Sequence, residues 1–196
     1  QLKQQQTLNK NLWHGIPVDT QLYDIHGCTG LMIAASNDHV EIVALLLELG
    51  ANQAVKDMRG WTALMYAAHA GKWGIIAFLL DWHREAAILT PRTIRRIQSP
   101  GYTGGATPYT PRSALRKALK GNKYRTLVDA TDENGWTALM FALRCGWESV
   151  VDALLERGAS TNVVTHDGKT TLMIASANGN KKLVNLLIKK HVNIDR

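Results

Sequence analysis

Apolar residues recur along this chain at the spacing of short amphipathic helices. Four threonines are each followed by a leucine two places later and by an alanine five places later, counted from the threonine. The leucine and the alanine therefore share one face of a helix. The threonine hydroxyl can accept a hydrogen bond from a first-turn amide, which predicts that a helix begins just after Thr29, Thr62, Thr137 and Thr170. An aliphatic stripe follows in each of three units and predicts a second helix, as at Val150, Val151, Leu154 and Leu155.

The pattern repeats at a fixed interval. Similar stretches open at Gly27, Gly60, Gly135 and Gly168, so the first and last intervals are 33 residues and the middle one is 75. The middle interval has room for two such periods and nine further residues, which predicts one degenerate unit and a loop. A unit of two short helices cannot bury both apolar stripes alone, so neighbouring units are expected to stack.

The link between the two helices of each unit is also regular. It is predicted at Asp38, Gly71, Gly146 and Gly179, residue types that tolerate a left-handed backbone better than most. In the second unit His83 replaces the helix-ending glycine of its siblings, Gly50 and Gly158. The second helix is therefore expected to continue to residue 89, before Thr90 and Pro91.

These residues resemble the ankyrin repeat. The motif Asp-x-x-Gly-x-Thr-x-Leu-x-x-Ala-Ala is followed by the closing sequences Leu-Leu-Glu-Leu-Gly-Ala at 46–51 and Leu-Leu-Glu-Arg-Gly-Ala at 154–159. The resemblance covers residues 24–83 and 132–196. This chain differs from the family at one repeated position, where methionine replaces the usual histidine, at Met32, Met65, Met140 and Met173. It implies an all-α ankyrin-repeat solenoid of stacked helix-turn-helix units with β-turn or hairpin loops, interrupted by a central insertion.

The resemblance and the breaks in the pattern predict seven segments. They are an N-terminal half repeat that caps the array (1–23), a repeat (24–56), a repeat with an extended second helix (57–89), a basic Pro/Gly-rich loop (90–112), a degenerate repeat (113–131) and two further repeats (132–164 and 165–196). In the half repeat, Leu8 and Leu12 are expected on one helical face. Because the chain stops where another unit would begin, we expect it to be part of a longer protein.

The charge is concentrated in one stretch, residues 86–128, which is called the basic segment below. It holds nine basic residues and no acidic one, whereas the whole chain has a net charge of +7. It is a candidate contact for nucleic acid or anionic lipid, because arginines and tyrosines could meet phosphates and stack on bases. The proposed basic patch consists of Arg92, Arg95, Arg96, Arg112, Arg116, Lys117 and Lys120.

The same stretch carries four Ser/Thr-Pro pairs. Phosphorylation by proline-directed kinases would add roughly −1.5 to −2 per site and nearly cancel the local charge, which makes the stretch a candidate electrostatic switch. A solvated spacer whose Ser/Thr-Pro pairs only form turns is the alternative. The candidate phosphosites are Thr90, Ser99, Thr107 and Thr110.

Chemistry other than binding finds little support in the sequence. The seven histidines show no metal-ligand spacing and no catalytic group is evident, so we expect a protein without enzymatic activity, metal or cofactor. Two cysteines, Cys28 and Cys145, fit a reducing compartment, and the longest apolar run is too short to span a membrane. These features predict a cytoplasmic protein, with the nucleus as the alternative.

The resemblance implies a scaffold or adaptor that binds protein partners on the concave side of the array, through turn tips and the ends of first helices. Trp61 and Trp136 are candidate binding residues, because tryptophan is enriched in binding hot spots. The alternative is that both only pack across the hairpins. Asn162 resembles the hairpin asparagine that a hydroxylase modifies in many ankyrin repeats. The partner-binding positions expected from the resemblance are His26, Asn37, Met58, Arg59, Trp61, His69, Glu133, Asn134, Trp136, Arg144, His166, Asp167 and Lys169.

Overall fold

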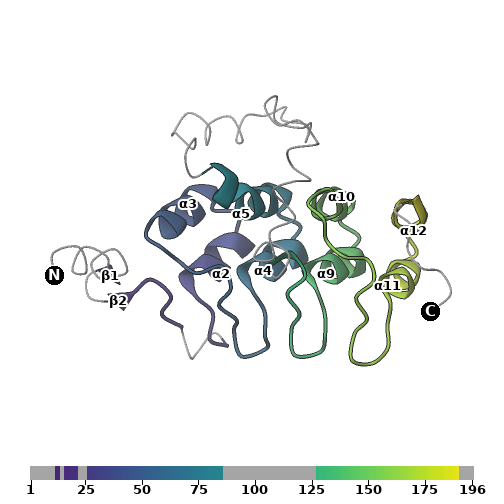
Figure 1. The fold of residues 1–196 in the computed structure, drawn as a ribbon, viewed down its shortest axis with the longest axis horizontal. Helices are drawn as coiled ribbons and strands as arrows, with labels where there is room; N and C mark the ends of the chain where they lie inside the picture. The colour runs from purple at the N-terminus through teal and green to yellow at the C-terminus, as the bar shows by residue number, and fades with distance from the viewer. Residues whose placement is uncertain (1–11, 14–15, 22–25, 86–126, 190–196) are drawn as a thin grey trace.

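The structure is a computed structural model that describes residues 12–13, 16–21, 26–85 and 127–189. Its helices stand in two rows, with hairpin loops projecting beyond the inner row (Figure 1). The inner row contains α2 (Gly30–Ser36), α4 (Ala63–His69), α9 (Ala138–Cys145) and α11 (Thr171–Asn178). The outer row contains α3 (Val40–Glu48), α5 (Trp73–Glu85), α10 (Glu148–Glu156) and α12 (Lys181–Lys189). The predicted all-α stack of helix pairs is confirmed.

The local signals for the helix ends act as predicted. Each inner helix begins after a threonine whose hydroxyl accepts a hydrogen bond from the amide of a methionine three residues later, at 3.2–3.4 Å. The links between the paired helices have positive φ angles: 65° at Asp38, 74° at Gly71, 79° at Gly146 and 75° at Gly179. The inner helices therefore begin at the predicted threonines, and the two helices of each pair are linked at the residues predicted to take a left-handed backbone.

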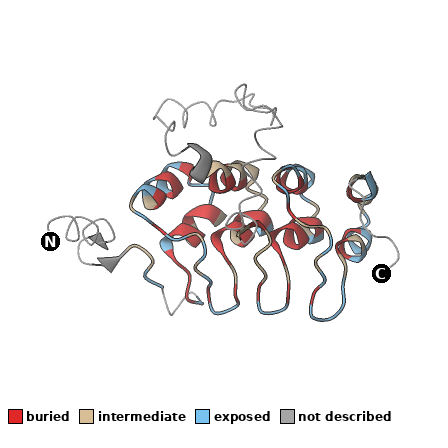
Figure 2. Cartoon of the chain, viewed as in Figure 1, coloured by how far each residue is buried: buried red, intermediate tan, exposed pale blue. Residues whose placement is uncertain are grey.

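The core lies between the two rows and between neighbouring units (Figure 2). Met32, Met65 and Met140 are at most 1% exposed, so methionine fills the place of the family's usual histidine. The equivalent Met173 is 51% exposed because no described unit covers α11 from the other side. Burial of these side chains thus depends on the neighbouring unit, as in other repeat arrays.

The units on either side of the basic segment are direct neighbours in the stack. Helix α4 packs against α9, and α5 packs against α10. The amide of Glu133 donates to the carbonyl of Arg59 at 3.2 Å. The same tip-to-tip bond joins the other neighbouring hairpins: the amide of Met58 donates to the carbonyl of His26, and the amide of His166 donates to that of Asn134. One continuous array therefore runs across the interruption.

These contacts bear on the 75-residue interval: the helices and hairpins of the two flanking units touch, so the units are neighbours in the stack. Residues 113–126 of the degenerate repeat predicted over 113–131 lie outside the described residues, so that repeat stays a prediction. The interval holds one period of 33 residues and 42 added ones. Residues 127–131 instead complete the second unit: Asp129 accepts a hydrogen bond from the amide of Ser160 at 2.7 Å, just as Asp19 accepts one from the amide of Asn52 at 3.0 Å.

The prediction for residues 1–23 is wrong in one respect. Leu12 does not lie on a helix but in the two-residue strand β1 (Leu12–Trp13), which pairs with β2 (Ile16–Pro17) in antiparallel register. Trp13 pairs with Ile16 across the two strands, and aromatic and β-branched residues favour extended backbone, which accounts for the difference. Helix α5 has 13 residues where α3, α10 and α12 have 9, and residues 86–89 of its predicted extension lie outside the described ranges.

Candidate protein-binding surface

Two buried aspartates shape the hairpins that carry the surface residues. Asp57 is 6% exposed, and its carboxylate accepts hydrogen bonds from the amides of Arg59 and Trp61 at 2.9 and 2.7 Å. Asp132 binds the amides of Asn134 and Trp136 at the same two distances. Because carboxylates that accept backbone amides fix a turn, each aspartate sets the direction of the tryptophan that follows.

The side chains of two neighbouring units meet in one cluster on the inner row, called the Arg–aromatic cluster below. The centre of the Trp61 ring lies 4.3 Å from that of Phe141, and the centre of the Trp136 ring lies 5.4 Å from that of Phe141. Such pairs stabilise by roughly 0.5–1.5 kcal/mol beyond the area they bury. The members are Arg59, Trp61, Tyr66, His69, Trp136, Phe141 and Arg144.

Both arginines of the cluster lie over its rings. The guanidinium carbon of Arg59 is 4.5 Å from the Trp61 ring centre, and that of Arg144 is 5.1 Å from the Trp136 ring and 5.5 Å from the Phe141 ring. A cation over an aromatic face is attracted by roughly 0.5–1 kcal/mol when exposed. The rings therefore restrict both guanidinium groups while their edges stay accessible.

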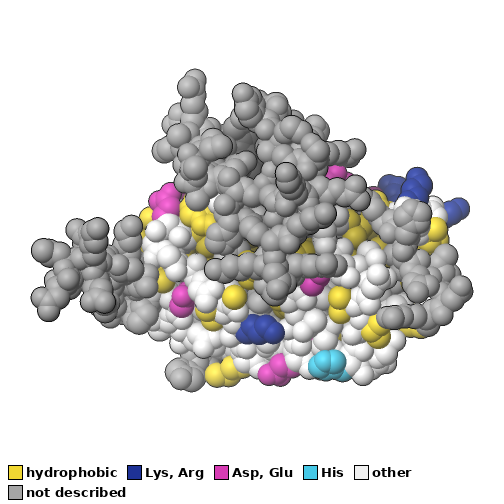
Figure 3. Space-filling model, viewed as in Figure 1, with side chains coloured by type: hydrophobic (Ala, Val, Ile, Leu, Met, Phe, Trp, Pro, Cys, Tyr) yellow, Lys and Arg dark blue, Asp and Glu magenta, His cyan; other side chains and the backbone are white. Residues whose placement is uncertain are grey.

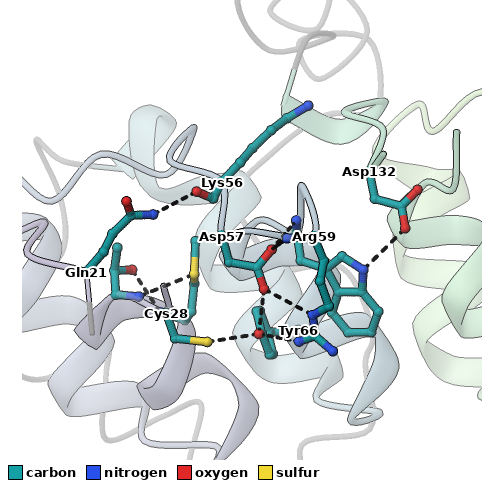
Figure 4. Close-up of polar contacts among 10 residues, drawn as sticks. Gln21, Cys28, Lys56, Asp57, Arg59, Tyr66 and Asp132 are labelled. Atoms are coloured by element: carbon teal, nitrogen blue, oxygen red, sulfur yellow. Dashed lines mark hydrogen bonds and ion pairs between the residues drawn. The ribbon is translucent and has the colours of Figure 1, made fainter. Parts of the chain in front are cut away.

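A polar network supports the first arginine from below (Figure 4). The Tyr66 hydroxyl donates to Asp57 at 2.8 Å, accepts from the Arg59 guanidinium at 2.6 Å and lies 2.9 Å from the Cys28 sulfur. Burial, followed by the contacts with Cys28 and Asp57, raises the pKa of Tyr66 well above its ordinary value. Burial alone would lower the pKa of Arg59, but its bonds to Tyr66 and Asp57 raise it. Arg59 is therefore a fixed cation.

Trp61 also joins the two units on either side of the basic segment. Its indole N–H donates to the carboxylate of Asp132 at 3.2 Å, and its ring contacts Phe141 of the next unit. Trp61 and Trp136 are both only half-buried. The geometry thus gives both tryptophans packing contacts and leaves part of each ring on the surface.

His69 stands between the two arginines. Its ring centre is 5.4 Å from that of Trp61 and 6.2 Å from that of Phe141. Burial lowers the pKa of His69, and the charges of Arg144 and Arg59 lower it further. A positive charge on His69 is therefore disfavoured, first by burial and then by the two arginines.

All thirteen positions expected to bind a protein partner fall within the described ranges. Most are exposed at hairpin tips or at the ends of inner helices, and Figure 3 shows hydrophobic, acidic and histidine side chains along the lower edge, where Figure 1 places the tips. Met58 is 54% exposed. The exposed positions are His26, Asn37, Met58, Arg59, His69, Glu133, Asn134, Arg144, His166, Asp167 and Lys169.

The remaining candidates are placed differently. Asn162 is described and exposed, and its amide donates to Ser160 Oγ at 3.3 Å. The proposed basic patch and the four candidate phosphosites lie outside the described residues, so their roles stay predictions.

Sequence reasoning missed two members of the cluster, Tyr66 and Phe141. A signal was present: both stand four places after the capping threonine, where the first and last units have Ile33 and Ile174. An aromatic residue in both central units is the pattern that predicts a shared ring cluster. The helical spacing considered in the sequence covered the second and fifth places after the threonine and gave the fourth no role, although Phe141 is only 2% exposed.

Residues 12–13, 16–21, 26–85 and 127–189 contain no group of three or more His, Cys, Asp and Glu side chains that could hold a metal ion. None of their helices combines the length and the apolar character needed to cross a membrane.

Comparison with known proteins identifies the family. The family model for ankyrin repeats in three copies matches residues 3–90 and 111–196, and the chain belongs to this family. Ankyrin repeats generally mediate protein–protein interaction, and they are typically not enzymes.

Several characterised proteins share part of the sequence. Over 62 residues, 32% of this chain, it is 45% identical to the human NAD-capped RNA hydrolase NUDT12, and the match covers 13% of that protein. It is 34% identical over 108 residues to the E3 ubiquitin-protein ligase KEG of Arabidopsis thaliana, covering 53% of this chain and 6% of the ligase. It is 28% identical over 94 residues to Inversin of Danio rerio, covering 48% and 9%. The chain thus spans a small part of each relative.

Proposed function

We propose that this chain is a non-catalytic recognition module, a scaffold or adaptor, and that it binds a protein partner across its hairpin tips and inner helices. The Arg–aromatic cluster carries the proposal. It offers arginines and half-buried tryptophans in one place, and these residue types dominate the binding energy of protein interfaces. Exposed Met58 and Asn134 extend the surface along the tips.

The rigidity of this surface supports the same function. The tips are joined by backbone hydrogen bonds, and Arg59 is held by Tyr66 and Asp57. A partner that binds a preorganised surface loses less of its binding energy to ordering of side chains, which costs roughly 0.5–1.5 kcal/mol for each immobilised one. The hydrolase, the ligase and Inversin share only segments with this chain, so their activities do not define the function proposed here.

Site-specific photo-crosslinking tests the proposal without a known partner. A photoreactive amino acid is placed at exposed Asn37 or Asn134 on the tips and inner helices, and at exposed Glu41 or Asp152 on outer helices as matched controls. Proteins captured in cells are then identified by mass spectrometry. We expect the inner positions to trap the same specific proteins and the outer positions to trap none of them. Equal capture at the outer positions would contradict the proposal.

The basic segment supports a second candidate function, binding of nucleic acid or anionic lipid, because nine basic residues follow one another without an acidic one. Phosphorylation at its Ser/Thr-Pro pairs would then weaken the contact. A gel shift with random RNA or DNA, and flotation with vesicles containing anionic lipid, test the two forms. Absence of both at low ionic strength removes this candidate.

A further inference from the structure

Acidic and basic side chains are divided unequally between the two rows of helices. The inner helices α2, α4, α9 and α11 contain no Asp or Glu, and their basic residues are His69 and Arg144. Three outer helices, α3, α5 and α10, carry the acids Glu41, Glu48, Asp81, Glu85, Glu148, Asp152 and Glu156 beside the basic residues His83 and Arg84. The fourth outer helix, α12, at the end of the described array, carries Lys181, Lys182 and Lys189. The inner face at the centre of the array is therefore positive, although the described part of the chain as a whole is not.

The acids nearest to the Arg–aromatic cluster are already engaged. The carboxylate of Asp57 binds two amides, Tyr66 and Arg59, and that of Asp132 binds two amides and the Trp61 indole. Both aspartates are buried. At the tips, Asp167 pairs with Lys169 at 2.7 Å, which leaves Glu133 as an exposed acid at the edge of the surface.

Arg144 differs from Arg59 in what it binds. The Arg59 guanidinium bonds to Asp57 and Tyr66. Arg144 is exposed, its guanidinium carbon lies over the rings of Trp136 and Phe141, and no carboxylate among the residues that the structure describes lies within ion-pairing distance of it. A planar guanidinium with free N–H edges matches the two oxygens of a carboxylate.

We infer that the inner face around Arg144 and Arg59 binds an acidic peptide segment of a partner protein. One carboxylate of the peptide pairs in bidentate fashion with Arg144, and a second one contacts the free edge of Arg59. Apolar parts of the peptide lie on the exposed edges of Trp61 and Trp136. This inference rests on the proposed function, because it names the chemistry of the segment that the same surface recognises.

Fluorescence anisotropy with the full 196-residue chain tests the inference. The probe is fluorescein-labelled hexaglutamate, with hexaglutamine and hexalysine as peptide controls, at about 0.05 M and about 0.5 M salt. Arg144→Gln removes the guanidinium, and Arg144→Lys keeps the charge without the planar fork. Lys120→Gln, in the basic segment, and Lys189→Gln, on α12, remove the same charge elsewhere.

We expect hexaglutamate to bind the wild-type chain in preference to hexaglutamine and hexalysine, and more weakly at high salt. Arg144→Gln should weaken its binding about tenfold, because charge-assisted hydrogen bonds are among the stronger ones. Arg144→Lys should lie between the wild type and Arg144→Gln. Lys189→Gln should change binding less than about twofold, and Lys120→Gln should weaken binding less than Arg144→Gln does.

Three results would overturn the inference: no preference for hexaglutamate, no effect of Arg144→Gln, or an equal loss with Lys120→Gln, which would assign the binding to the basic segment. The proposed function fails separately, if the inner positions capture no specific protein by photo-crosslinking. If the inner positions capture specific proteins but hexaglutamate does not bind, the proposed function holds and the inferred acidic peptide is wrong.

Discussion

Replacing Gly60 with alanine places a methyl group directly in the contact between the units that flank the basic segment. Gly60 has a φ angle of +78°, and an added Cβ would lie 2.8 Å from the amide nitrogen of Glu133 and 3.0 Å from the Cα of Asp132. Those are backbone atoms, so relief requires the two hairpins to separate. The substitution therefore tests whether the units are neighbours.

Gly168 provides the matched control. Its φ angle is +80°, nearly that of Gly60, but an added Cβ would meet nothing within 4 Å. Both substitutions carry the cost of a left-handed backbone, about 1–2 kcal/mol. Only Gly60→Ala adds overpacking, which typically costs about 1–3 kcal/mol. Gly60→Ala should thus destabilise the chain by about 1–3 kcal/mol more than Gly168→Ala.

Urea unfolding followed by far-ultraviolet circular dichroism measures the difference. The free energies of unfolding are compared by linear extrapolation, and an unchanged denaturant slope shows that both variants unfold as the wild type does. If Gly60→Ala and Gly168→Ala cost the same, the reasoning fails, because Gly60 would then face open space as Gly168 does.

Three further predictions concern the inner helices. Thr137→Val removes the hydroxyl that accepts from the first turn of α9 and should cost about 1 kcal/mol in urea unfolding; no loss would mean that the cap is dispensable. The pKa of His69, followed by NMR, should lie below 6.5 and should rise in Arg144→Gln; an ordinary pKa would contradict the geometry. Because the unfolded state binds a proton at His69 more readily than the folded state, the contribution of His69 to stability is present above pH 6.5 and is lost as the pH falls. Trp147→Phe loses the 3.0 Å bond from its indole N–H to the carbonyl of His69 and should cost about 1 kcal/mol by thermal unfolding.

The fold of each unit could be predicted from local chemistry. A capping threonine, a leucine two places later and a residue that tolerates positive φ at the link define a helix pair without reference to the rest of the chain. Thr62, Thr137 and their equivalents cap as expected, and Asp38 takes the left-handed backbone as the glycines do.

Local chemistry could not decide whether the interruption contains another stacked unit. An interval of 75 residues is compatible with two periods, one of them degenerate, and nine further residues, or with one period and 42 added residues, and counting does not distinguish them. The decision depends on contacts between units, namely Arg59 with Glu133 and Trp61 with Asp132. The same limit applies to the candidate site. Sequence position predicted that both Arg59 and Arg144 bind a partner. That they lie in one cluster depends on the direct contact of α4 with α9.

The continuity of the array across the basic segment is tested most directly by a distance measured against an internal standard. Met58, Glu133 and His166 each stand four places before the capping threonine of their unit. Spin labels are attached to cysteines at 58 and 133 in one sample and at 133 and 166 in another, after both native cysteines are replaced. Packed helices lie about 8–10 Å apart, so one step along the stack is about 10 Å and two steps are about 20 Å. We predict the same distance for both pairs; a separation for 58 and 133 about twice that for 133 and 166 would place another unit between them and contradict the account.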